Sequence, residues 1–206
     1  MTMMRSILWA AMLSSAALPV AAGETLGDGT PIRDEDTARL EALDRATGAA
    51  LREVLGEGDD QLVAQAVAVL RGTPGPAGTV DPSTLAGEWS CRMTKIGGIA
   101  PLLSYPPFRC HIGADEGILQ FEKLTGSQRT RGVIHQDGDA WVYLGSSFVQ
   151  GEEPRAYADF PQQMDTQATE TLPDVGVFEV TGPGTARILF PLPYRESVLN
   201  VLTLTR

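Results

Sequence analysis

The hydrophobic period of this chain changes once, and the change divides it into two parts of different structural class. Up to Gly72 the apolar residues recur at helical spacing, whereas after residue 84 they alternate with polar residues in short runs. The segment between them, 73–83, carries Thr-Pro-Gly-Pro-Ala-Gly, which interrupts regular structure. We therefore expect a helical unit at 34–72, a linker at 73–83 and a β-domain at 84–206.

Two helices are predicted within 34–72. Acidic residues at 34–36 begin the first helix, where negative charge favours the helix dipole, and Gly56 and Gly58 end it. A second helix begins at the acidic pair 59–60 and ends at Gly72. Because each helix has one apolar face, we expect a hairpin that packs on the β-domain or, alternatively, an arm that contacts a partner.

Eight strands are expected in the β-domain. They are predicted near 86–95, 105–113, 117–124, 128–136, 140–147, 175–181, 185–191 and 197–205. Eight strands in up-and-down order suit a small barrel, so the predicted fold class is α+β: a helical hairpin followed by an antiparallel eight-stranded barrel or curved meander. The connection 150–174 is long and carries six acidic residues, and we expect a solvated loop there or, alternatively, a lid.

Residues 1–22 have the pattern of a secretory signal peptide. Arg5 precedes an apolar run at 7–17, and small residues at 20–22 predict cleavage after Ala22. The run is too short for the alternative of an uncleaved membrane anchor, so no stable membrane insertion is expected. The product would be a periplasmic or secreted protein with a flexible N-terminus at 23–33.

The charge of the mature chain excludes one class of partner. Without Arg5 it has 15 basic and 26 acidic residues, a formal charge of −11. Such a chain does not bind DNA or an anionic membrane by bulk attraction. We expect no nucleic-acid partner.

The two cysteines of the chain are predicted to form a disulfide. Cys91 and Cys110 are separated by 18 residues, and an exported protein meets an oxidising compartment. The alternatives are two buried thiols or half of a metal site. A metal site is not expected, because only His111 and His135 could contribute and neither has ligand spacing.

Signatures of catalysis are absent from the sequence. It contains no Gly-x-Ser-x-Gly, no His-Glu-x-x-His, no phosphate-binding loop and no dinucleotide fingerprint. A carboxylate pair could still perform acid–base work, but no spacing singles one out. We therefore lean against an enzyme and expect no cofactor.

Basic residues concentrate between Trp89 and Gly132. This stretch has a net charge of +3, whereas the rest of the mature chain carries −14. Strand alternation places Lys95 on the same face as Cys91, and it places Lys123 on the same face as Phe121. The only two lysines of the chain are thus expected to face inward at strand ends.

Two explanations of these lysines remain open. Each could reach water at the barrel mouth or pair with a buried acid. Alternatively, they could hold an anionic group together with arginines, whose planar fork suits carboxylate and phosphate. A turn at 125–127 would bring Lys123 near Arg129 across a hairpin. The candidate ligand-binding residues are Lys95, Lys123, Arg129 and Arg131.

The same stretch carries a resemblance to a known family. Trp-Ser-Cys-Arg at 89–92, Lys-Ile-Gly-Gly at 95–98 and Phe-Glu-Lys-Leu-Thr-Gly-Ser-Gln-Arg-Thr at 121–130 resemble the bacterial exported family catalogued as domain of unknown function 4893. The resemblance implies a periplasmic protein and assigns no activity. In addition, Gly-Glu-Trp at 87–89 is similar to the opening of lipocalin-like barrels and of small periplasmic metalloprotease inhibitors, although the inhibitors lack such a helical hairpin.

Two functions follow as expectations. The first is a non-catalytic periplasmic module that binds a small anionic or amphipathic ligand at the mouth of a lipocalin-like barrel. The second is a protein-interaction module, either a protease inhibitor or an envelope accessory protein, acting through the hairpin or the acidic loop. An open interior lined by Lys95 and Lys123 would favour the first, and a solid barrel with an exposed apolar patch on the hairpin would favour the second.

Overall fold

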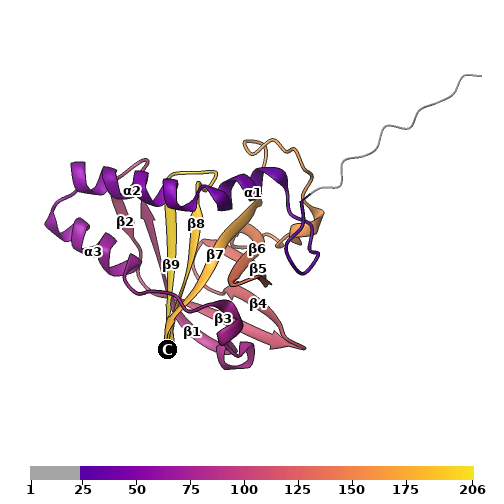
Figure 1. The fold of residues 1–206 in the computed structure, drawn as a ribbon. Helices are drawn as coiled ribbons and strands as arrows, with labels where there is room; N and C mark the ends of the chain where they lie inside the picture. The colour runs from indigo at the N-terminus through magenta and orange to yellow at the C-terminus, as the bar shows by residue number, and fades with distance from the viewer. Residues whose placement is uncertain (1–23) are drawn as a thin grey trace, which may run out of the picture.

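The computed structural model describes residues 24–206, and the predicted signal peptide with its cleavage point after Ala22 lies outside them. Within these residues, three helices precede nine strands (Figure 1). The helices are α1 Asp34–Glu41, α2 Leu43–Glu57 and α3 Asp60–Leu70. The strands are β1 Gly87–Ile96, β2 Leu102–Ser104, β3 Phe108–Asp115, β4 Ile118–Lys123, β5 Gln128–Asp137, β6 Ala140–Val149, β7 Leu172–Gly182, β8 Thr185–Pro191 and β9 Leu199–Thr205. No helix in this part of the chain is long and apolar enough to cross a lipid bilayer.

Eight of the strands form a closed antiparallel barrel, so the predicted fold class is confirmed. The strands follow one another in chain order from β3 to β9, and β1 closes the barrel by pairing with β3 near its start and with β9 along the rest. The short β2 pairs only with the end of β1 and was not predicted. Closure removes the exposed edges that an open sheet of this size would present.

The predicted boundary between the long loop and the following strand is wrong. β6 continues to Val149 and β7 begins at Leu172, because residues Ser146 and Ser147 pair with Pro173 and Leu172. Asp174, expected in a solvated loop, therefore lies within a strand.

One end of the barrel is filled. The 3-10 turn η1 Ala77–Thr79 lies in the segment predicted as a linker, 73–83, and a second one, η2 Pro82–Leu85, begins at its end. Their Ala77 and Leu85 are buried in the interior cluster, and the indole Nε1 of Trp89 donates to the Leu85 carbonyl over 2.9 Å. The disulfide between Cys91 and Cys110 is present in the same cluster, with 5.9 Å between the Cα atoms.

The helices cover the outside of the barrel. Figure 1 shows α2 and α1 running one after the other across β9, β8 and β7, with α3 folding back beside α2. Val54 and Ala66 of the helices pack with Leu189 and Val201 in an apolar layer separate from the barrel interior. The first predicted helix is divided at Ala42, whose N–H is shared between two carbonyls.

Arg187 fastens α3 to the barrel wall. Its Nε donates to Glu179 over 2.5 Å, and its Nη atoms donate to the carbonyls of Val69, Arg71 and Gly72. These carbonyls lie at the C-terminal end of α3, where they have no donors within the helix and where positive charge is favourable. One buried guanidinium thus supplies hydrogen bonds that the helix end needs.

Two glycines that pair across β5 and β6 leave the wall without side chains near its open end. Gly132 of β5 lies opposite Gly145 of β6, which lies opposite Asp174 of β7. A Cβ atom on Gly145 would strike the Tyr143 hydroxyl and the carbonyl of Arg131. The missing side chains therefore leave room for polar groups on the inner wall.

Candidate ligand-binding site at the barrel mouth

A cavity of about 500 Å³ opens at the end of the barrel opposite η2, where β1, β4, β6 and β8 end. Below it the barrel is solid, because Tyr143 meets Phe121 and Phe190 edge to face, each at 5.8 Å between ring centroids. Part of its wall is apolar, from Met93, Phe108, Phe148, Leu172 and Tyr194. The charged residues that line it are Arg39, Lys95, Lys123, Arg129 and Arg195, against Glu170, Asp174 and Glu196.

Lys123 is the buried cation of this cavity that lacks an acidic partner. Lys123 is the last residue of β4, its side chain is on the inner face of the barrel, and only 5% of the residue is exposed. The Nζ atom donates to the carbonyls of Thr125 and Gln128 and lies 3.7 Å from the ring centroid of Phe108. Within residues 24–206 no carboxylate forms an ion pair with it. Burial lowers the pKa of Lys123 to about 8, and the positive charges of Arg129 and Lys95 add to this.

Lys95 faces the same cavity but is neutralised. Its Nζ atom forms an ion pair with Glu196 and donates to Oε1 of Gln128 over 3.0 Å. The ammonium also lies 5.6 Å from the ring centroid of Tyr105. Of the explanations considered from the sequence, pairing with an acidic residue applies to Lys95 and, within residues 24–206, not to Lys123.

The two arginines proposed from the sequence lie in different places. Arg129 lines the cavity, and its Nε donates to the Gly126 carbonyl over 3.3 Å. The side chain of Arg131 is 54% exposed on the outside of the wall, with its Nε 3.9 Å from Glu122. Arg131 does not line the cavity. It shares a strand face with Arg129 but lies two residues further along β5, away from the barrel mouth.

A carboxyl group stands on the inner wall of the cavity at Asp174. Its Oδ2 accepts a hydrogen bond of 2.6 Å from Thr130, whose Oγ1 lies 2.7 Å from the hydroxyl of Tyr143. Burial raises the pKa of Asp174 to about 6, against the opposing effect of the Thr130 hydrogen bond. Burial, followed by the charge of Asp174, also raises the pKa of Tyr143 well above its usual value, so this phenol stays protonated.

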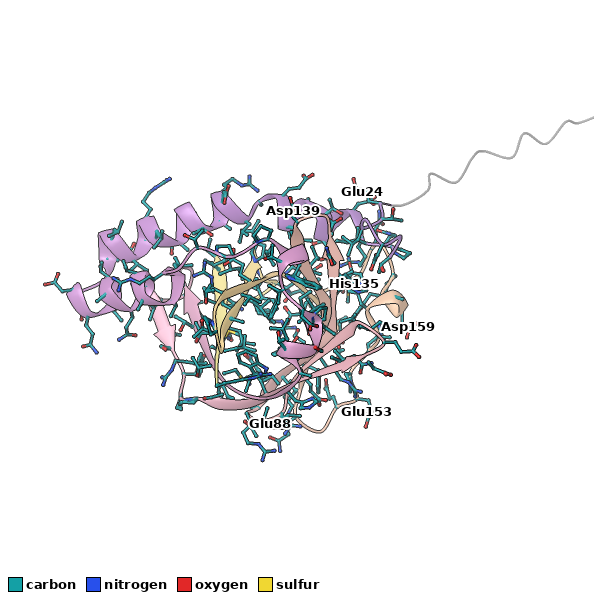
Figure 2. The ribbon with its side chains drawn as sticks, turned by 60° about the horizontal axis from the view of Figure 1, so that its bottom comes forward. Glu24, Glu88, His135, Asp139, Glu153 and Asp159 are labelled. Carbon is teal, nitrogen blue, oxygen red and sulfur yellow. A yellow bond between two sulfur atoms is a disulfide. The ribbon has the colours of Figure 1, made fainter. Side chains whose placement is uncertain are left out.

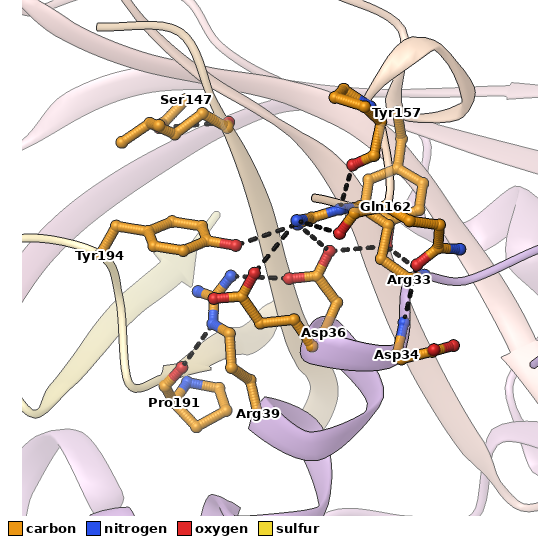
Figure 3. A network of polar contacts seen from close by, with 12 residues as sticks. Arg33, Asp34, Asp36, Arg39, Ser147, Tyr157, Gln162, Pro191 and Tyr194 are labelled. Atoms are coloured by element: carbon orange, nitrogen blue, oxygen red, sulfur yellow. Dashed lines mark hydrogen bonds and ion pairs between the residues drawn. The ribbon is translucent and has the colours of Figure 1, made fainter. Parts of the chain in front are cut away.

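The rim of the cavity is held by a buried ionic network on α1 (Figure 3). Asp36 is fully buried and accepts hydrogen bonds from Arg33 at 3.0 Å, from Arg39 at 2.9 Å and from the Tyr157 hydroxyl at 2.8 Å. Arg33 also donates to the hydroxyl of Tyr194. The network therefore joins α1 to both loops that border the cavity.

The long loop, now 150–171, is fastened along this rim. Nη1 of Arg195 contacts both carboxylate oxygens of Glu170, at 3.0 and 3.1 Å, and its Nη2 donates to the carbonyls of Thr166 and Thr169. In the facing loop Glu196 has a φ of 72°, a left-handed conformation that is uncommon for residues other than glycine. That conformation accompanies the pairing of Glu196 with Lys95.

Several further acidic side chains lie on the outside of the protein, away from the cavity. Glu88, Glu153 and Asp159 project from the surface in Figure 2. His135 also lies on the outer face, with Nδ1 2.9 Å from Asp28. Neither His135 nor His111 lines the cavity.

Sequence reasoning missed Thr130, Tyr143 and Asp174. The alternation Asp174, Gly176, Phe178 would have placed the carboxyl on the inner face once the strand was extended to Leu172. Arg39, Arg195 and Glu196 come from a helix and a loop, and no local pattern shows that these segments meet the barrel mouth.

Comparison with known proteins gives one match. The sequence model of a family described as Domain of unknown function (DUF4893) matches residues 30–204. No curated protein and no solved structure matches the chain.

Proposed function

Because the chain belongs to the DUF4893 family, whose description carries no activity, we propose from its cavity that it is an exported, non-catalytic module that binds a small anionic or amphipathic ligand. The observation that carries the proposal is Lys123, a buried ammonium group in an open cavity with no acidic partner among the described residues. Export is supported by the signal-like pattern of 1–22 and by the disulfide.

An unpaired buried ammonium group lowers the stability of the protein when no ligand is bound. Burying a charge without an opposite charge is unfavourable, and two carbonyl acceptors compensate only part of the loss of water. The nearby charges of Arg129 and Lys95 add to the cost. A bound anion would remove it and would raise the pKa of Lys123 back toward its usual value.

The rest of the cavity fits a small ligand with an apolar portion. Its volume of about 500 Å³ falls in the range of small-molecule sites. Phe108, Leu172 and Tyr194 offer an apolar wall beside the cations. Arg129 adds a guanidinium that can hold a carboxylate, sulfonate or phosphate through two parallel hydrogen bonds.

The alternative of a protein-interaction module has one observation in its favour. Leu55 of α2 and Val67 of α3 are exposed by 67% and 48%. Exposed apolar side chains are common on protein surfaces and do not by themselves indicate a partner, whereas the cavity gathers several charged groups. The ligand-binding function is therefore the better supported.

Replacing Lys123 with methionine is expected to weaken binding of an amphipathic anion about tenfold, the loss of one charge-assisted hydrogen bond. The probe is 8-anilinonaphthalene-1-sulfonate, titrated by fluorescence at pH 7. Because the amine loses its charge as the pH rises through about 8, wild-type affinity should fall between pH 7 and 9 and the variant should not show this fall.

Arg131→Met is the matched control, since it removes a cation from the neighbouring strand β5 that lies outside the cavity. It should bind the probe like the wild type. Cooperative thermal unfolding of both variants excludes probe binding to a partly unfolded chain. Equal affinity of the wild type and Lys123→Met, with the same pH dependence, would refute the proposed function.

A further inference from the structure

The charges that line the cavity leave three groups without an ion-pair partner inside the described part of the chain. Lys95 forms an ion pair with Glu196, Arg195 forms one with Glu170, and Arg39 forms one with the buried Asp36 of α1. The remaining groups are Lys123, Arg129 and Asp174. The cavity thus offers two free cations and one free carboxyl to whatever occupies it.

The carboxyl of Asp174 is built to face the cavity rather than the wall. Asp174 shares the inward phase of Phe178, and the absence of a side chain at Gly145, its partner on β6, leaves room for the Tyr143 hydroxyl. The Tyr143 hydroxyl can donate to Thr130, which donates to Oδ2 of Asp174, so one oxygen is held and oriented. Among the described residues, no hydrogen bond reaches the other oxygen, Oδ1.

Other charged groups near Asp174 are already engaged. From α1, the charges of Arg39 and Asp36 act on the pKa of Asp174 in opposite directions, and these two residues are bonded to each other over 2.9 Å. From β5 and β6 it meets the neutral Thr130 and the protonated Tyr143. No cation of residues 24–206 forms an ion pair with Asp174.

The free cations and the free carboxyl are separated along β5. Lys123 donates to the carbonyl of Gln128, and Asp174 accepts from Thr130, two residues further on the same strand. Two residues of a strand span on the order of 7 Å. A ligand that meets both groups therefore needs opposite charges about that far apart.

We infer that the ligand is a small zwitterion whose two charged groups lie about 7 Å apart, as in an ω-amino acid, with its anionic group bound to Lys123 and Arg129 and its protonated amine bound to Asp174. This inference rests on the proposed function and narrows its ligand class. Such a ligand is attracted to the carboxylate of Asp174, which would repel a ligand that carries only negative charge.

The pH dependence follows from the carboxyl. With a pKa of about 6, Asp174 is charged at pH 7.5 and neutral at pH 5. A zwitterion should therefore bind more weakly as the pH falls through 6, because its amine loses a counter-charge. A plain anion should bind more strongly over the same range, because a repulsive charge disappears.

Two matched probes test the inference by isothermal titration calorimetry. They are 6-aminohexanoate and hexanoate, which share a carboxylate and a chain and differ in the amine. At pH 7.5 the wild type is expected to prefer 6-aminohexanoate about tenfold, the effect of one charge-assisted hydrogen bond. The preference should shrink as the pH falls from 7.5 to 6, a range in which both probe carboxylates stay charged, and it should disappear in Asp174→Asn, whose amide oxygen can still accept from Thr130.

The outcomes separate the two proposals. If hexanoate binds the wild type at pH 7.5 as well as 6-aminohexanoate does, or if Asp174→Asn keeps the preference, the zwitterion inference is overturned while anion binding at Lys123 stands. If neither probe binds although 8-anilinonaphthalene-1-sulfonate does, the inference is overturned as well. If that sulfonate also fails to bind, the proposed function itself falls.

Discussion

Asp36→Ala is expected to lower the free energy of unfolding by about 3–5 kcal/mol, the cost of removing one member of a buried ion pair. Asp36 is fully buried and is the acceptor for Arg33, Arg39 and the Tyr157 hydroxyl. Its loss leaves two guanidinium groups, exposed by 3% and 6%, without their shared counter-charge. In a domain of this size each kcal/mol corresponds to about 2–4 °C in Tm, so a large thermal shift should appear.

The control for this substitution lies two residues away. Asp34 is in the same first turn of α1, its residue is exposed, and no side-chain ion pair is formed by it within residues 24–206. Asp34→Ala should change stability by a few tenths of a kcal/mol through the helix dipole alone. Urea unfolding of both variants measures the difference, and a gap below 1 kcal/mol would show that the network on α1 does not stabilise the fold.

Removing the disulfide is expected to lower the free energy of unfolding by about 3 kcal/mol. The bond joins β1 to β3 across the first pairing of the barrel, and both cysteines are buried in the interior cluster. In the chain-entropy model, reopening the 19-residue separation between Cys91 and Cys110 restores freedom to the unfolded chain. The bond also fixes β1 beside β3, where Phe108 lines the cavity.

The double variant Cys91→Ala/Cys110→Ala avoids free thiols and is compared with the wild type in urea, with and without reductant. Reductant should destabilise the wild type to nearly the level of the variant and leave the variant unchanged. If the wild type and the double variant have the same midpoint without reductant, the bond contributes nothing to stability.

Much of the fold could be predicted from the sequence because its signals are local. The alternation of β1, β3 and β4 placed Lys95 and Lys123 on the inner wall, where the structure has them. The change of hydrophobic period after Gly72 located the boundary between the helices and the β-domain. Such patterns arise from contacts between residues close in the chain or directly across a hairpin.

The rest of the site depends on contacts that a local pattern does not encode. Arg39, Glu196 and Asp174 meet at the mouth because a helix, a loop and a strand converge there. Whether Lys95 or Lys123 is neutralised depends on Glu196, 101 residues from Lys95 in the chain. The outward phase of Arg131 could not be decided before the strand was known to place Thr130, which precedes it, on the inner wall.

The central claim is that the cavity holds a small ligand through Lys123, and native mass spectrometry tests it most directly. The wild type, Lys123→Met and Arg131→Met are isolated in the same way from the cells that make the protein. The wild type and Arg131→Met should each carry an additional small mass that denaturation releases, and Lys123→Met should lack it. If all three proteins carry the additional mass, or if none of them does, the account is contradicted.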